Sequence, residues 1–178
     1  MKTLLTRMIG AARLKASIYE QVEADPSSMT GAVLVVLASS IAAVVGSGVW
    51  DLSGVMGALF VSLATWVVWV GLTFVIGTWV MPEPSTHATL GELFRTTGFS
   101  ASPGVLRIFG LIPGAALPIA IGITFWMLLT FIVAVRQALD YTGSGRAFAV
   151  CFLGWLIYAI LFFGFCTGVV SVTGGPSP

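Results

Sequence analysis

Long apolar runs separated by short polar segments dominate the pattern of this sequence. Four runs contain no charged residue: residues 31–50, 54–81, 108–135 and 147–178. A helix needs about 20 mostly apolar residues to cross the hydrocarbon core of a bilayer. The pattern therefore predicts at least four membrane-spanning helices, joined by short polar segments and preceded by a more polar N-terminal region.

The segment at residues 94–110, FRTTGFSASPGVLRIFG, interrupts this pattern because it holds two arginines among glycine, serine and proline. If it stays on one side of the membrane, the chain has four spans, and Arg136 and Arg146 share a side with Asp51. If it crosses, there are five spans, and Arg95, Arg136 and Arg146 all lie with the basic N-terminal region. Positive residues gather on the cytoplasmic side of a membrane, so the five-span arrangement is favoured.

We therefore expect an all-α integral membrane protein with a cytoplasmic N-terminus and a C-terminus outside. An amphipathic interfacial helix, residues 1–25, precedes a domain of five transmembrane helices, residues 26–178. Gly98, Pro103 and Gly104 predict that the third helix is short or bent, because glycine and proline weaken or break a helix. The expected spans are about residues 30–50, 54–81, 92–111, 117–138 and 146–171.

Two polar segments carry helix-start signals. Thr89 is followed three residues later by Glu92, which is the spacing of a capping box, so we expect a helix to begin at Leu90. Asp51 and Ser53 lie in a tight polar turn between two apolar runs, and the closing residues of this turn can cap the second span.

The N-terminal region alternates apolar and charged residues. Its apolar side chains can share one helical face: Leu4, Leu5, Met8, Ile9 and Ala12. Its basic side chains lie at the edges of that face or opposite it: Lys2, Arg7, Arg13 and Lys15. A basic amphipathic helix favours an anionic membrane surface. The alternative is a solvated leader that only sets the orientation of the chain.

The composition agrees with a membrane protein and argues against nucleic-acid, metal and catalytic sites. The 178 residues are 57% hydrophobic and 8% charged, with a mean hydropathy of +1.03, whereas soluble domains average about 25% charged residues. No basic patch suited to nucleic acid is present. His87 is the sole histidine, and a metal site needs several converging ligands. No nucleophile motif is evident, so we expect no enzyme activity, no cofactor and no metal.

Arg107 is the most informative charged residue because it falls inside the expected third span. It follows Arg95 by twelve residues, about 18 Å along a straight helix, whereas the hydrocarbon core is about 30 Å thick. An arginine within a span marks a functional site by default and is expected to face other helices or water. The alternative is that its side chain extends outward to lipid phosphates.

A second constellation lies between the fourth and fifth spans. Arg136 and Asp140 are four residues apart and can pair on one helical face, and Arg146 follows a short turn. The first interpretation is a clamp that joins the two helices and fixes their orientation. The alternative is a contact for a partner's acidic group or a lipid phosphate. Arg95 has the same alternative, beside an exposed pair with Glu92.

Small residues recur at intervals of four along two spans. Ala38, Ala42 and Gly46 line one face of the first span, and Gly164 with Gly168 forms a G-x-x-x-G pattern in the last. Helices approach closely in lipid through such faces. We expect packing within the bundle, and the fifth helix is the best candidate for a contact with another protein or a second copy.

The order of motifs in the second half of the chain resembles the Yip family, whose eukaryotic members are named as Ypt/Rab-interacting proteins. The similarity is concentrated in residues 95–147, in the segments RTTGFSASPGVL, LIP, VRQALDY and GRA. It implies a cytoplasmic N-terminus followed by five membrane helices. Eukaryotic members act with small GTPases in vesicle traffic through a longer N-terminal region, so GTPase binding is not expected here. The compact form is similar to bacterial members, which implies a bacterial inner membrane.

Two functional hypotheses follow. The first is a non-enzymatic scaffold or interaction protein that binds the lipid bilayer and another membrane protein or a second copy, and so influences membrane organisation. The second is a small transporter or channel for an anionic or lipid-like solute, with Arg107 in a cavity beside a broken third helix.

Overall fold

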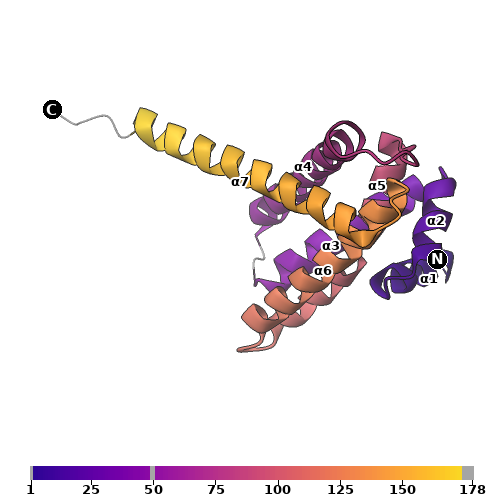
Figure 1. The fold of residues 1–178 in the computed structure, drawn as a ribbon. Helices are drawn as coiled ribbons and strands as arrows, with labels where there is room; N and C mark the ends of the chain where they lie inside the picture. Colours follow the sequence, from indigo (N-terminus) through magenta and orange to yellow (C-terminus); the bar gives the residue numbers. More distant parts are fainter. Residues whose placement is uncertain (1, 49–50, 174–178) are drawn as a thin grey trace.

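A computed structural model describes the backbone of residues 2–48 and 51–173, and the side chains of residues 3–48 and 51–160. The described residues form helices and contain no strand (Figure 1). The elements are α1 (Lys2–Ala12), α2 (Ala16–Ala24), α3 (Ser28–Gly46), α4 (Leu52–Val75), the π-helical turn η1 (Ile76–Val80), α5 (Leu90–Ser100), the 3₁₀-helix η2 (Ser102–Leu111), α6 (Ala116–Ala138) and α7 (Ser144–Thr173).

Three helical stretches are long and apolar enough to cross a membrane: α3, α4 together with η1, and α6. The part of α7 whose side chains are described, Ser144–Ile160, is apolar but shorter than these three stretches. Outward-facing side chains on these helices are largely apolar, for example Phe60 and Leu117. The fold is therefore a helical bundle of the kind found in membrane proteins.

The segment that interrupts the sequence pattern lies at the centre of the bundle. It consists of α5 followed by η2, and both parts pack against α3 and α6. The change from α-helix to 3₁₀-helix falls at Ala101, directly before Ser102 and Pro103. Proline removes a backbone donor and favours a new helical start, so the two-part helix lies where the glycines and Pro103 predicted a break.

Glycines permit the close packing of this central segment. A Cβ atom on Gly46 would collide with the backbone carbonyl of Arg107, and a Cβ on Gly104 would collide with the hydroxyl of Ser39. Gly46 therefore packs within the bundle, and Ala42 on the same helix is buried. Ala38 is half-buried. Gly164 and Gly168 belong to the part of α7 whose surroundings lie outside the described residues.

Two buried apolar clusters hold the helices together. One joins α4, η1, α5, α6 and α7 through residues such as Val70, Leu93 and Leu139. The other joins α1, α2, α3, α5 and α6 through residues such as Tyr19 and Phe99. Both clusters include residues from the end of α6, so the best-packed region lies toward the end of the bundle where α5 begins.

The N-terminal region is a hairpin of two helices, α1 and α2, and not the single helix expected from the sequence. Leu14 adopts a left-handed conformation with a φ of 59°, which reverses the chain between the helices. The hydroxyl of Tyr19 donates to the carbonyl of Ala11 at 3.2 Å. The two helices pack closely at Gly10, where a Cβ would meet Ile18.

The apolar face of α1 is shared between the bundle and the surroundings. Leu4 and Met8 pack on the second cluster, whereas Leu5 and Ile9 are more than half exposed. Arg13 and Lys15 are exposed at the tip of the hairpin, as a membrane-surface role requires, and the side chain of Lys2 lies outside the described residues.

Arg7 has a different role from the one expected of a surface residue. Its guanidinium pairs with Asp25 at 2.9 Å and donates to Ser28 at 2.7 Å. These bonds tie α1 to the beginning of α3. Hydrogen bonds from Ser27, Arg7 and Ser28 hold the pKa of the Asp25 carboxyl well below its usual range.

The helix-start signals are confirmed. Thr89 accepts from the backbone of Glu92, and Glu92 accepts in return from the backbone of Thr89, which completes a capping box at the start of α5. Asp51 caps α4 by accepting from the backbone N–H of Gly54 at 2.7 Å. At these two positions, hydrogen bonds between residues close in the sequence are enough to set where the helix begins.

Candidate functional site

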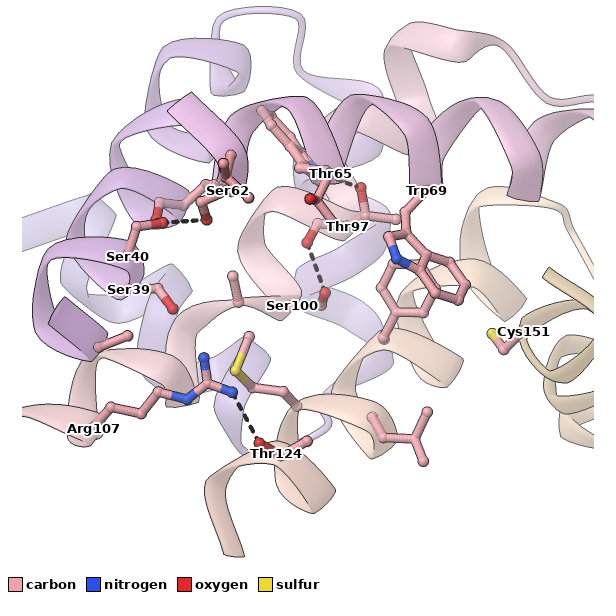
Figure 2. A pocket seen from close by; sticks show the side chains of 18 of the residues that line it. Ser39, Ser40, Ser62, Thr65, Trp69, Thr97, Ser100, Arg107, Thr124 and Cys151 are labelled. Carbon is pink, nitrogen blue, oxygen red and sulfur yellow. Dashed lines mark hydrogen bonds between the residues drawn. The ribbon is translucent and has the colours of Figure 1, made fainter. Parts of the chain in front are cut away.

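A large cavity lies between α3, α4, α5, α6 and α7 (Figure 2). Its volume is about 860 Å³, toward the upper end of the range usual for ligand pockets. Most of its walls are apolar. Hydroxyl groups contribute the polar surface: Ser39, Ser40, Ser62, Thr65, Thr97, Ser100 and Thr124. The cavity is therefore shaped for a mainly apolar ligand with a few polar contacts.

Arg107 is the one charged side chain among the described residues that line this cavity. It extends from η2, and Figure 2 shows its guanidinium directed into the cavity. A single hydrogen bond holds it, from its Nη2 atom to the hydroxyl of Thr124 at 3.0 Å. No acidic side chain of the described residues pairs with it. The guanidinium thus keeps most of its donors free within an apolar chamber.

The position of Arg107 is fixed by its backbone. Close approach of η2 to α3 at Gly46 and Gly110 seats the segment against the end of α3, and the side chain then reaches Thr124 on α6. Thr124 lies eight residues after the first residue of α6, about 12 Å along the helix. The charge is therefore half-buried and lies beside the first half of α6, not at the end of that helix.

Ser39 lies on the same side of the cavity as Arg107 (Figure 2). Its residue is 5% exposed, and its hydroxyl has no hydrogen-bond partner among the described residues. No described side-chain oxygen is both buried and without a partner, so the Ser39 hydroxyl is accessible from the cavity. Arg107, Thr124 and Ser39 together form a small polar subsite with unused donors.

Several other hydroxyls of the cavity are already occupied. Ser40 donates to the carbonyl of Val36 at 2.8 Å and contacts the hydroxyl of Ser62 at 2.5 Å. Ser100 donates to the carbonyl of Thr97 at 2.6 Å. Thr65 has no hydrogen bond among the described residues, so the subsite at Arg107 differs from the rest of the wall by its charge.

Arg136 and Asp140 do not form the ion pair that their spacing predicted. The helix α6 ends at Ala138, and Asp140 has a positive φ of 52°, so the two side chains no longer share a helical face. Arg136 instead donates to the carbonyls of Tyr141 and Thr142, both at 3.4 Å.

Arg146 forms a clamp at this end of the bundle. It pairs with Glu83 at 3.4 Å and donates to the carbonyl of Pro82 at 2.8 Å. Glu83 also accepts from the backbone of Thr142 at 3.0 Å, and these bonds with Thr142 and Arg146 lower the pKa of its carboxyl. The α6–α7 turn is thereby joined to the segment after η1, whereas the clamp interpretation had these residues join the fourth and fifth spans.

Arg95 is also committed to the fold. Its guanidinium donates to the carbonyls of Val22, at 3.0 Å, and Glu23 at the end of α2. It does not pair with Glu92, whose carboxylate serves the capping box. Arg95 therefore fastens the N-terminal hairpin with two of its five donors.

Sequence reasoning singled out Arg107 and placed it in a cavity beside the third helix, but it missed Ser39. Polar residues within uncharged apolar runs were the available signal, namely Ser39, Ser40, Ser62 and Thr65. Among the side chains that the structure describes, no three His, Cys, Asp or Glu residues converge to hold a metal ion.

No family model, curated protein or solved structure matches this chain. The resemblance to the Yip family accordingly stays a prediction that depends on the motifs of residues 95–147.

Proposed function

We propose that the chain crosses a bacterial inner membrane five times, with the N-terminus in the cytoplasm and the C-terminus outside. The course of α5 and η2 supports this topology. Leu93 packs near Leu139 at the end of α6, whereas Arg107 reaches Thr124 in the first half of α6. The two-part segment thus runs antiparallel to α6 along most of its length, as a crossing segment does.

We further propose that the protein binds an anionic group within the membrane, at Arg107, as a small transporter or channel for an anionic solute does. The observation that supports this function is the unpaired guanidinium in an otherwise apolar cavity. Placing a charge in a span is costly, and a bound anion offsets that cost. Guanidinium also suits phosphate and carboxylate because it donates in a planar fork.

The scaffold hypothesis has less support from the described residues. Arg95, Arg136 and Arg146, the candidate partner contacts, are engaged with the protein's own carbonyls and with Glu83. These bonds hold the helices together and give the three arginines a structural role, whereas Arg107 makes one hydrogen bond and has no counterion among the described residues.

The test compares head groups at constant chain length. The protein is purified in dodecyl maltoside, so that a neutral single-chain amphiphile is always in excess, and is titrated with dodecyl phosphate. Trp66, Trp69 and Trp155 line the cavity, so intrinsic tryptophan fluorescence reports occupancy, and native mass spectrometry gives the stoichiometry. We expect saturable binding of one dodecyl phosphate.

Substituting Arg107 provides the decisive comparison. Arg107→Gln removes a charge-assisted contact worth about 1.5–3 kcal/mol, so the affinity for dodecyl phosphate should fall at least about tenfold. Arg13→Gln is the matched control, because Arg13 is exposed on the hairpin and the substitution changes the net charge equally. The affinity of this variant for dodecyl phosphate should equal that of wild type. Equal affinity of Arg107→Gln and wild type would contradict the proposed function.

A further inference from the structure

The cavity is open to one side of the bundle through apolar walls. Six of its lining residues are also exposed at the protein surface: Val61 on α4, Thr124 and Leu128 on α6, and Phe148, Phe152 and Trp155 on α7. These side chains place the opening among α4, α6 and α7.

The character of this opening differs from that of a water-filled pore. Phe148, Phe152 and Trp155 form a continuous row of stacked rings, with centroids 6.2 Å apart at each step. In a bundle that spans a bilayer, such a row faces the acyl chains. An opening lined by these rings admits an apolar chain from the bilayer. The rings cannot replace the water molecules that hydrate a soluble anion.

The volume limits how much of a ligand enters. A cavity of about 860 Å³ holds roughly thirty groups of about 30 Å³, the share of one water molecule in the liquid and a similar size to a methylene. That is enough for one head group and one acyl chain. A second chain would have to remain in the bilayer.

We propose that the ligand is a membrane lipid with a phosphate or carboxylate head, which enters sideways through the opening bordered by α4, α6 and α7. Its head binds Arg107, Thr124 and Ser39, and one acyl chain lies along the aromatic wall toward the opening. This inference rests on the proposed function, since it names the class of molecule whose anionic group Arg107 binds. The charge of Arg107 and the missing counterion argue for the anionic head, and the lateral opening argues for the chain.

The experiment keeps the phosphate group of the ligand constant. It varies the presence of the ligand's alkyl chain and the space in the cavity. Wild-type protein in dodecyl maltoside is titrated with dodecyl phosphate and, separately, with inorganic phosphate. Ala58 lines the cavity on α4, so Ala58→Trp fills part of it. Ala64 is exposed on the same helix and does not line the cavity, so Ala64→Trp is the matched control. Ala43→Phe, on α3, is a second filling variant.

We expect half-saturation by dodecyl phosphate at a concentration at least tenfold below that for inorganic phosphate. The filling variants should weaken dodecyl phosphate binding at least tenfold and leave inorganic phosphate binding unchanged, and Ala64→Trp should resemble wild type. Equally tight binding of inorganic phosphate, or filling variants that bind dodecyl phosphate normally, would overturn the lipid inference while the anion site stands. Equal affinity of wild type and Arg107→Gln for dodecyl phosphate would instead rule out the anion site itself.

Discussion

At the scale of single residues, the glycines of α3 and η2 decide how deeply Arg107 sits in the bundle. Gly46 allows the backbone of η2 to contact the end of α3. Without that contact the arginine would lie further from Thr124. The small-residue spacing in the sequence identified Gly46 as a packing position, but the partner surface could not be read from the sequence because η2 is a 3₁₀-helix.

Gly46→Ala is predicted to destabilise the protein by about 1–3 kcal/mol, the usual cost of overpacking a well-filled site. The added methyl group would collide with the Arg107 carbonyl, which cannot turn aside as a flexible side chain can. Thermal unfolding in detergent measures the effect. Gly71→Ala is the control, because a Cβ there would meet no atom outside its own helix backbone within 4 Å; it should be neutral or slightly stabilising, since alanine favours a helix more than glycine does. A neutral Gly46→Ala would show that η2 packs more loosely than described.

Residue identity alone could not separate the functional polar groups from the structural ones. Arg107 and Arg95 lie on the same two-part segment, yet the first faces a cavity and the second binds the carbonyls of α2. Ser39 and Ser40 are adjacent in sequence, but only the second finds a hydrogen-bond partner. The distinction depends on which neighbouring helix each side chain meets.

At the scale of elements, the sequence predicted helix starts well and the N-terminal hairpin poorly. Capping chemistry at Thr89 and Asp51 is local, and both caps are present. The break between α1 and α2 occurs at Leu14, a residue that rarely adopts a left-handed conformation. Packing on the bundle, through Tyr19 and Phe99 among others, stabilises the hairpin against that local preference.

The attachment of α2 is predicted to depend on pH through Glu23. Burial, together with repulsion by Asp140 and Glu92, raises the pKa of Glu23 to about 7. The folded protein therefore holds a proton that the unfolded chain releases between about pH 4.5 and pH 7, and stability falls as the pH rises through this window. Glu23→Gln removes this effect and should add about 1 kcal/mol at pH 8, after allowance for solvent screening.

Thermal unfolding of wild type and Glu23→Gln at pH 5 and pH 8 checks this expectation. The stability difference should be small at pH 5 and favour the variant at pH 8. Glu83→Gln is a control of opposite sign, because the pKa of Glu83 is lowered and its charged form contributes most at neutral pH. The same gain for Glu23→Gln at both pH values would contradict a raised pKa.

At the scale of the whole molecule, the cavity arises from the way the helices diverge. Apolar residues such as Val61 and Phe152 have the same character whether they face lipid, a core or a cavity, so hydropathy could predict the long helices but not the space between them. The predicted five crossings and the position of Arg107 within the bilayer depend on the same question, which is whether α5 and η2 together cross the membrane.

The most direct test of this account is the location of the two chain ends, measured with a reporter fused before Met1 in one version and after Pro178 in another. The account predicts a cytoplasmic N-terminus and a C-terminus outside, because α5 with η2 supplies the fifth crossing. Both ends on the same side would contradict it. Arg107 would then lie in a segment that does not cross the bilayer, and the intramembrane anion site would have to be abandoned.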